Sequence, residues 1–320
     1  MPGMTARARL GLVAGLGIGA CTAVQARING ALGARLHDGI AAATISFGIG
    51  VVVLAVVFSF SAPLRDGVRT LRRAVSDGAL RPWQLLGGVC GAFFVASQGL
   101  TVAALGMTAF TVAVVAGQLA SSLVVDRLGL GPSGPTPVTG VRLAGAGLGV
   151  LAVALAGLGH PGTAGGLPIS DALRGGPTAA LIMLPALAGI GVAWQQAMNG
   201  RVGAIGSPTS AAMVNFCVGF GALLVCEAAL IATTGAPDTF PTEPWLYLGG
   251  LIGIAVIAVA ALTVRWIGVL LLGLTSVAGQ LVASLVLDVL TPTEAGLSGT
   301  AIVGCLLTIS AIGVATRSWR

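Results

Sequence analysis

The chain has 320 residues, of which 56% are hydrophobic and 8% are charged, and its mean hydropathy is +0.99. Soluble domains carry about 25% charged residues, so this composition excludes a soluble globular protein and predicts a membrane protein. The net charge of +6 does not indicate nucleic-acid binding, because the sixteen basic residues, all of them arginine, lie in separate short segments.

Ten apolar stretches follow one another along the chain, each near the roughly 20 residues that a helix needs to cross a bilayer. They cover residues 8–27, 40–60, 82–103, 108–127, 139–158, 179–199, 209–232, 244–264, 267–288 and 297–315. We therefore expect an all-α integral membrane protein with about ten transmembrane helices. Arg7 and Arg9 before the first stretch are also typical of a signal peptide, but its repeat partner at 179–199 favours a retained helix.

The two halves of the sequence are internal repeats of each other. GQLASSLVVD at 117–126 returns as GQLVASLVLD at 279–288, and WQLLGGVCG at 83–91 returns as WLYLGGLIG at 245–253. These matches predict a first five-helix repeat at 1–158, an external linker at 159–178 and a second repeat at 179–320. Five helices per repeat is an odd number, so the second copy enters the membrane inverted, as in many secondary transporters.

The arginines fit this inversion. With the N-terminus inside, thirteen arginines lie in cytoplasmic segments and three in external ones, so both termini are expected in the cytoplasm of a plasma (inner) membrane protein. The loop at 61–81 carries five arginines, whereas its counterpart at 233–244 carries none and contains Asp238 and Glu243. We interpret the arginines at 65–73 as a topology determinant, with an interfacial helix that binds anionic lipid as the alternative.

Polar residues form matching stripes on the fourth and ninth stretches. The stripes are Gln118, Ser122 and Asp126, and Gln280, Ser284 and Asp288. Four-residue steps drift by only about 40° around a helix, so each trio shares a face. The two stripes predict the lining of a substrate cavity, with hydrogen bonding between helices as the alternative for the glutamines and serines. Asp126 adjoins Arg127 and is expected to be an interfacial residue.

A second polar set lies near the ends of the first and sixth stretches. Gln25 and Asn29 recur as Gln195 and Asn199, and Gln196 lies beside them. The glutamines are candidates for substrate contact. Each asparagine precedes a glycine and is expected to end its helix, with a polar contact on the same face as its glutamine as the alternative. Trp194 precedes this set, and it fits either a ligand contact or an aromatic anchor at the membrane interface.

Four more buried polar positions complete the candidates. Ser46 and Asn215 occupy matching places in the second and seventh stretches, whereas Gln98 has no polar counterpart. Glu227 lies inside the seventh stretch, about five residues from its outer end, and is a proton-coupling candidate by default. A helix-pairing or snorkelling role is the favoured alternative for Glu227, because the position is shallow.

Glycines at four-residue spacing predict close helix packing. They are Gly15, Gly19, Gly87, Gly91, Gly249 and Gly253. The five cysteines fall inside apolar stretches and the two histidines stand alone in loops, so no metal site is expected. We expect no cofactor, and the absence of a GxxxxGK[ST] loop excludes ATP binding of that type.

Several of these segments together resemble a known family. They are QARING with AATISFGIG, QQAMNG with SAAMVNFCVGF, and the GQL-x-x-S-L-x-x-D block that follows each. They are similar to the YdcZ-type branch of the drug/metabolite transporter superfamily, in a tandem-fused, EamA-like form over about 10–158 and 180–316. The resemblance implies ten helices around a central cavity and transport of small metabolites or toxic compounds, often outward. The small multidrug exporters of the superfamily carry a glutamate in the first helix, and this chain has none there.

We therefore expect a secondary transporter, not an enzyme, that exports a small polar or amphipathic metabolite or drug by alternating access. Its expected partners are the lipid bilayer and a small-molecule substrate, without nucleic acid, and a homo-oligomer is left open. An uncharged amide and serine lining favours neutral or zwitterionic cargo. The alternatives are a non-transporting membrane partner or regulator, and an enzyme acting on lipid-linked substrates. The enzyme is disfavoured because Asp126 and Asp288 fall at opposite membrane faces.

Overall fold

The computed structural model describes residues 6–151 except 142, 149 and 150, residues 178–290 except 236 and 238, and positions 303, 306, 307 and 310. Almost all of the linker expected at 159–178, half of the fifth stretch and most of the tenth stretch lie outside the described residues. Every element in the described part is helical. The elements are α1 (Ala6–Leu36), α2 (Gly39–Phe60), α3 (Ala62–Ser76), η1 (Pro82–Leu85), α4 (Gly87–Arg127), α6 (Thr178–Ile205), α7 (Pro208–Thr234), η3 (Pro244–Tyr247) and α8 (Gly249–Leu290).

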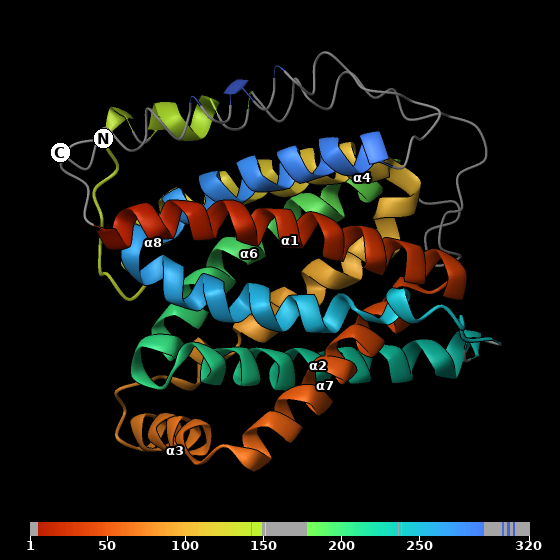
Figure 1. The fold of residues 1–320 in the computed structure, drawn as a ribbon, viewed down its shortest axis with the longest axis horizontal. Coiled ribbons are helices and arrows are strands. Elements are labelled where there is room, and N and C mark those ends of the chain that lie inside the picture. Colours follow the sequence, from red (N-terminus) through yellow and green to blue (C-terminus); the bar gives the residue numbers. More distant parts are fainter. Residues whose placement is uncertain are drawn as a thin grey trace.

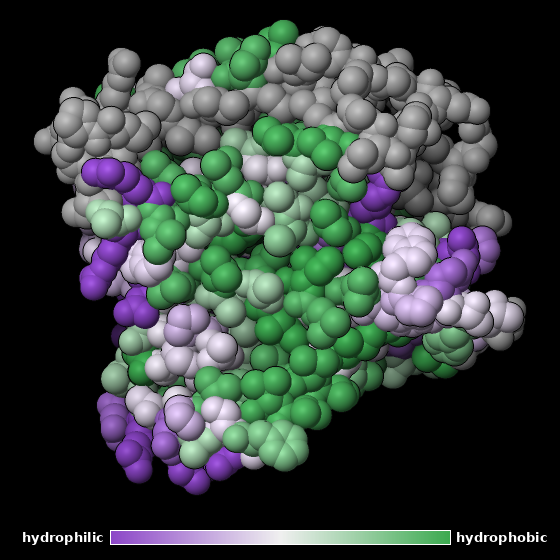
Figure 2. All heavy atoms as spheres, viewed as in Figure 1, coloured by the Kyte–Doolittle hydropathy of each residue, from purple (hydrophilic) through white to green (hydrophobic). Residues whose placement is uncertain are grey.

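The long helices lie side by side, and the shorter α3 lies against one end of the bundle (Figure 1). Figure 2 shows hydrophobic residues over the middle of this bundle and hydrophilic residues at its two ends. By length and composition, five helical segments within the described residues could cross a membrane. They are Ala6–Leu36, Gly39–Phe60, Pro82–Val102, Pro208–Thr233 and Pro244–Ser284. This distribution of polarity is that of a protein whose middle lies in lipid.

Two pairs of expected helices are joined into single long elements. α4 contains both the third and the fourth apolar stretch, and α8 contains the eighth and the ninth. α8 nevertheless bends at Gly268, whose φ of 74° and ψ of 173° are not helical. Only glycine adopts such a backbone readily, so Gly268 divides α8 into two arms close to the break expected at residues 265–266. α4 also changes direction, and its second part returns alongside α8 (Figure 1).

Glycines bring several pairs of helices into backbone contact, and the two most extensive helix contacts join α1 to α8 and α4 to α6. A methyl group on any of four glycines would meet the backbone of the facing helix. The contacts join Gly19 to Ser276, Gly279 to Leu16, Gly117 to Ala186 and Gly189 to Val114. The first two contacts hold α1 against the second arm of α8, and the other two hold the second part of α4 against α6. Each pair combines one helix from each half of the sequence.

The first helix of each half runs in the opposite direction to the other. A Cβ on Gly11, near the start of α1, would meet Ile267, and a Cβ on Gly200, near the end of α6, would meet Val264. Because Ile267 and Val264 are neighbours at the bend of α8, the start of α1 and the end of α6 lie at the same end of the bundle. An inverted repeat needs this arrangement.

Candidate transport cavity

A cavity of about 70 Å³ lies between the two halves of the chain. A cavity of this size holds a few water molecules or part of a small solute. Its polar and aromatic lining residues are Thr22, Gln25, Phe47, Phe94, Gln118, Gln195, Gln196, Asn199, Asn215, Phe216, Ser276 and Gln280. None of the described residues that line it is charged. The site therefore offers amides, hydroxyls and aromatic rings to an occupant, and no ion pair.

One buried polar cluster joins α1, α2 and the beginnings of α4 and α8. Ser46 Oγ donates a hydrogen bond of 2.7 Å to Asn29 Oδ1, and Asn29 Nδ2 donates one of 2.8 Å to Gln98 Oε1. Gln25 Nε2 donates to the carbonyl oxygen of Gly249 at 3.1 Å. Four polar side chains are thus buried with partners, which lowers the cost of removing them from water.

A second cluster occupies the equivalent place in the other half. Asn215 Oδ1 accepts hydrogen bonds from Gln195 Nε2 at 2.9 Å and from Asn199 Nδ2 at 3.0 Å. A Cβ on Gly91 would meet the Gln195 amide, and one on Gly87 would lie 3.0 Å from Asn199 Oδ1. The glycine step of α4 therefore leaves room for the amides of α6.

At the start of α8, glycines of the second half likewise leave room for amide side chains of the first half. A Cβ on Gly249 would meet Asn29 Oδ1, and one on Gly253 would lie 2.8 Å from Gln25 Nε2. Each glycine step thus accommodates a polar cluster on the first helix of the other half. The repeated sequence blocks and the repeated polar pairs are parts of one interface.

Neither asparagine ends its helix, so that expectation was wrong. α1 continues past Asn29 to Leu36, and α6 continues past Asn199 to Ile205. Both asparagine side chains are buried and hydrogen-bonded across helices instead. The matching positions of Ser46 and Asn215 were the sequence signal for this pairing, because each supplies the partner of the asparagine in its own half.

Among the stripe residues whose side chains the structure describes, the glutamines alone reach the cavity. Gln118 and Gln280 line it, and Gln280 Nε2 also donates to Thr111 Oγ1 at 3.3 Å. Ser122 and Ser284 are buried but do not line the cavity, and Ser122 Oγ donates to its own helix at Leu119. The serines lie one helical turn beyond the cavity wall.

Asp126 is buried within the protein and caps a helix. It is 7% exposed, and its two carboxylate oxygens accept hydrogen bonds of 3.2 Å from the backbone N–H groups of Val269 and Leu270. These groups open the second arm of α8 directly after the bend at Gly268, where helical N–H groups lack partners within the helix. The side chain of Asp288 lies outside the described residues.

Three other candidates differ in their relation to the cavity. Gln196 lines it, and its Oε1 has no hydrogen-bond partner among the described residues. Gln98 is fully buried and holds Asn29 instead of lining the cavity. Trp194 packs against Trp83 with ring centroids 5.6 Å apart and does not line the cavity either.

Charged side chains gather at the end of the bundle where α1 meets α2. Glu227 is 8% exposed, does not line the cavity and interacts electrostatically with Asp38. Arg35 and Glu243 form an ion pair there, and the hydrogen bond from Arg35 lowers the pKa of the Glu243 carboxyl from its ordinary value of 4.5. In the part of the chain that the structure describes, no three His, Cys, Asp or Glu side chains are grouped to hold a metal ion.

Comparison with known proteins agrees with this architecture. The family described as "Putative inner membrane exporter, YdcZ" matches residues 10–155 and again residues 180–314. A solved structure titled only "Crystal structure of protein" shares 21% identity over 98% of both chains, with a TM-score of 0.61, and therefore has the same fold. No curated protein matches the chain. The two family matches cover most of the chain, which belongs to the YdcZ family of inner-membrane exporters in the drug/metabolite transporter superfamily and carries the family unit twice.

Proposed function

We propose that the protein is a secondary transporter that exports a small polar or amphipathic molecule across the inner membrane by alternating access. The observation that supports this function is the cavity, which equivalent glutamines from both halves line. Gln25 matches Gln195 in the repeat, and Gln118 matches Gln280. In the proposed architecture, ten transmembrane helices form two inverted five-helix repeats with both termini in the cytoplasm.

The two most extensive helix contacts support a division of the cavity into two walls. Gln25 and Gln280 belong to the pair formed by α1 and the second arm of α8, and Gln118 and Gln195 belong to the pair formed by α4 and α6. Helices in backbone contact move together more readily than they separate. We infer that each pair acts as one rigid wall and that rocking of the walls exposes the cavity to alternate sides.

The lining also limits the cargo. Amide groups donate and accept hydrogen bonds, and Phe47, Phe94 and Phe216 add apolar surface. A strongly charged solute would lose its hydration without gaining an ion pair, which costs several kcal/mol. The proposed cargo is therefore neutral or zwitterionic.

The test is a thermal-shift ligand screen on the purified protein, followed by counterflow of the hits in liposomes. Gln118→Ala and Gln280→Ala should each weaken the apparent affinity for the cargo about tenfold, because a hydrogen bond in a buried site is lost. Ser284→Ala is the matched control, since Ser284 lies on the same face as Gln280 but outside the cavity wall. Full activity of both glutamine variants would remove these residues from the site. Failure of every screened compound to bind or exchange would favour a non-transporting membrane partner.

Glu227 is the candidate for proton coupling in the same assay. Its Oε2 lacks a hydrogen-bond partner among the described residues, so the carboxyl is not committed to a neighbour through that atom. If Glu227 carries the coupled proton, Glu227→Gln should abolish the pH dependence of transport into inverted vesicles while leaving counterflow intact. An unchanged pH profile would make Glu227 a structural residue.

A further inference from the structure

The inner face of α3 is fixed onto the bundle. Leu64 and Val68 pack against the cluster between α2, α4 and α7, while Leu71 and Ala74 are buried in the cluster that includes residues of α6, α7 and α8. The contact is close, because a Cβ on Gly206 in the turn between α6 and α7 would lie 2.9 Å from Leu71. The apolar residues recur at helical spacing, so packing onto the protein uses one side of α3 and leaves the other side free.

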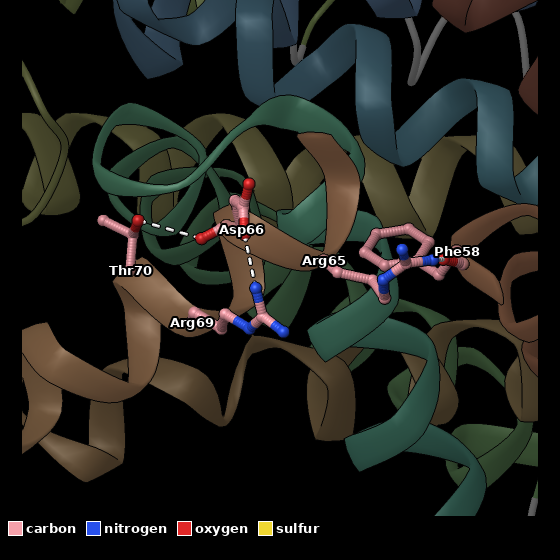
Figure 3. Close-up of polar contacts among 5 residues, drawn as sticks. All are labelled: Phe58, Arg65, Asp66, Arg69 and Thr70. Atoms are coloured by element: carbon pink, nitrogen blue, oxygen red, sulfur yellow. Dashed lines mark hydrogen bonds and ion pairs between the residues drawn. The ribbon is translucent and has the colours of Figure 1, made fainter. Parts of the chain in front are cut away.

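The arginines of α3 divide into two groups. Arg65, which lies beside Phe58 at the end of α2 (Figure 3), donates to the backbone carbonyl oxygens of Phe58 at 3.0 Å and of Ser59 at 2.5 Å. Arg69 pairs with Asp66 at 2.8 Å (Figure 3). Both guanidinium groups are therefore engaged with the chain itself, where they fix the corner between α2 and α3.

Arg72 and Arg73 form the second group. Both are exposed, and neither guanidinium group makes a hydrogen bond or an ion pair with any residue that the structure describes. A guanidinium group is a planar fork of donors that matches a phosphate group well. Two such groups lie side by side on a helix that is itself held in place.

The surroundings place these arginines at the edge of the apolar surface. Phe60, directly before α3, is 88% exposed, and Trp83, shortly after it, is 36% exposed. Exposed aromatic residues are typical of the layer where lipid headgroups meet the hydrocarbon. In Figure 2 the hydrophilic surface at the lower left, over α3, directly adjoins hydrophobic surface.

We propose that the outer face of α3 binds the headgroup phosphates of anionic phospholipids through Arg72 and Arg73. The cytoplasmic leaflet, where the arginine distribution places this loop, is the anionic one. The counterpart loop in the second half, 233–244, has no arginine, so the site belongs to one leaflet. Because α3 contacts the α6–α7 turn at Gly206, lipid bound there holds the end of α6 as well. This inference does not depend on what the cavity transports.

The experiment titrates the purified full-length protein in detergent micelles with phosphatidylglycerol or with phosphatidylcholine and follows the unfolding temperature by tryptophan fluorescence. Phosphatidylglycerol should raise the midpoint more than phosphatidylcholine, and sodium chloride should reduce the difference by screening. Arg72→Gln/Arg73→Gln should raise the phosphatidylglycerol concentration that gives half of the maximal shift in unfolding temperature, by about fivefold for each arginine removed. Arg72→Lys/Arg73→Lys retains the charge and should keep much of the effect.

Arg65→Gln/Arg69→Gln is the matched control, because it removes the same charge from the same helix. The unfolding temperature of this variant in phosphatidylcholine should fall, because the corner between α2 and α3 is weakened. The additional rise in unfolding temperature that phosphatidylglycerol causes should remain. Equal loss of the increment in the two glutamine double variants would show a response to net charge alone and would overturn the proposed site. A wild-type protein that responds equally to both lipids would overturn it as well.

Discussion

At the scale of single residues, Asp126 connects the two halves of the molecule. It stands at the end of the doubled Gln-x-x-x-Ser-x-x-x-Asp stripe, and its carboxylate caps the second arm of α8 behind Gly268. A helix that begins inside a protein exposes N–H groups that need acceptors, and a carboxylate also interacts favourably with the helix dipole. The break at Gly268 and the carboxylate of Asp126 therefore act together: the glycine interrupts α8, and the aspartate caps the arm that begins after it.

We predict that Asp126→Ala destabilises the protein by about 1–2 kcal/mol, the usual cost of losing a helix cap. Asp126→Asn should retain most of the stability, because an asparagine oxygen also accepts from backbone N–H groups. Thermal unfolding of the purified variants measures both. An alanine variant as stable as the wild type would show that the cap contributes nothing. An asparagine variant as weak as alanine would assign the effect to charge instead.

The sequence did not predict this role of Asp126, for a physical reason. Its partners, Val269 and Leu270, lie more than 140 residues away, and a cap supplied from another helix leaves no local pattern. The neighbouring Arg127 indicated only that Asp126 lies near the membrane interface. By contrast, the equivalent positions of Gln118 and Gln280 at the cavity could be expected from the sequence, because equal spacing in both repeats places them on equivalent helix faces.

At the scale of helices, glycines determine which elements belong together. α1 approaches α8 at Gly19 and Gly279, and α4 approaches α6 at Gly117 and Gly189. Between apolar helices in lipid, association relies on close packing, so backbone contact at small residues is the main attraction. The four-residue glycine spacing predicted close packing but not the partners, because glycine steps occur on several helices.

A pair of substitutions on α1 isolates this contact. Gly19→Ala places a methyl group against the backbone of Ser276, and such overpacking costs about 1–3 kcal/mol. Gly17→Ala adds the same methyl group where no atom lies within 4 Å, so it should be neutral or slightly stabilising. Thermal stability in detergent, read by size-exclusion profiles after heating, compares the two. Equal behaviour would mean that helix propensity, not contact with α8, decides the outcome.

At the scale of the whole molecule, the two ends of the bundle differ in chemistry. One end carries α3 with its arginines, and Arg201 of α6 donates to the Gly129 carbonyl oxygen in the loop after α4. The other end carries the Arg35–Glu243 ion pair. The arginine counts predicted this difference, because positive charge marks the cytoplasmic side whatever the fold. An interfacial helix at 65–73 was only the alternative interpretation of the arginines, because they do not show the packing against α6 and α7 that stabilises the helix at residues 62–76.

Cysteine accessibility tests the complete topology. In a cysteine-free background, Ser76→Cys at the end of α3 and Ser133→Cys in the loop after α4 should react with an impermeant maleimide only after right-side-out vesicles are opened. Thr239→Cys, in the loop before α8, should react in intact vesicles. All three positions are exposed, so a difference in labelling reports the side of the membrane rather than burial. Ser76 follows the second helix of the first half, and Thr239 follows the second helix of the second half. If the two halves had the same orientation in the membrane, these two positions would lie on the same side and label together. Labelling of both from one side would therefore exclude the inverted arrangement, and with it the rocking of two equivalent walls around the cavity.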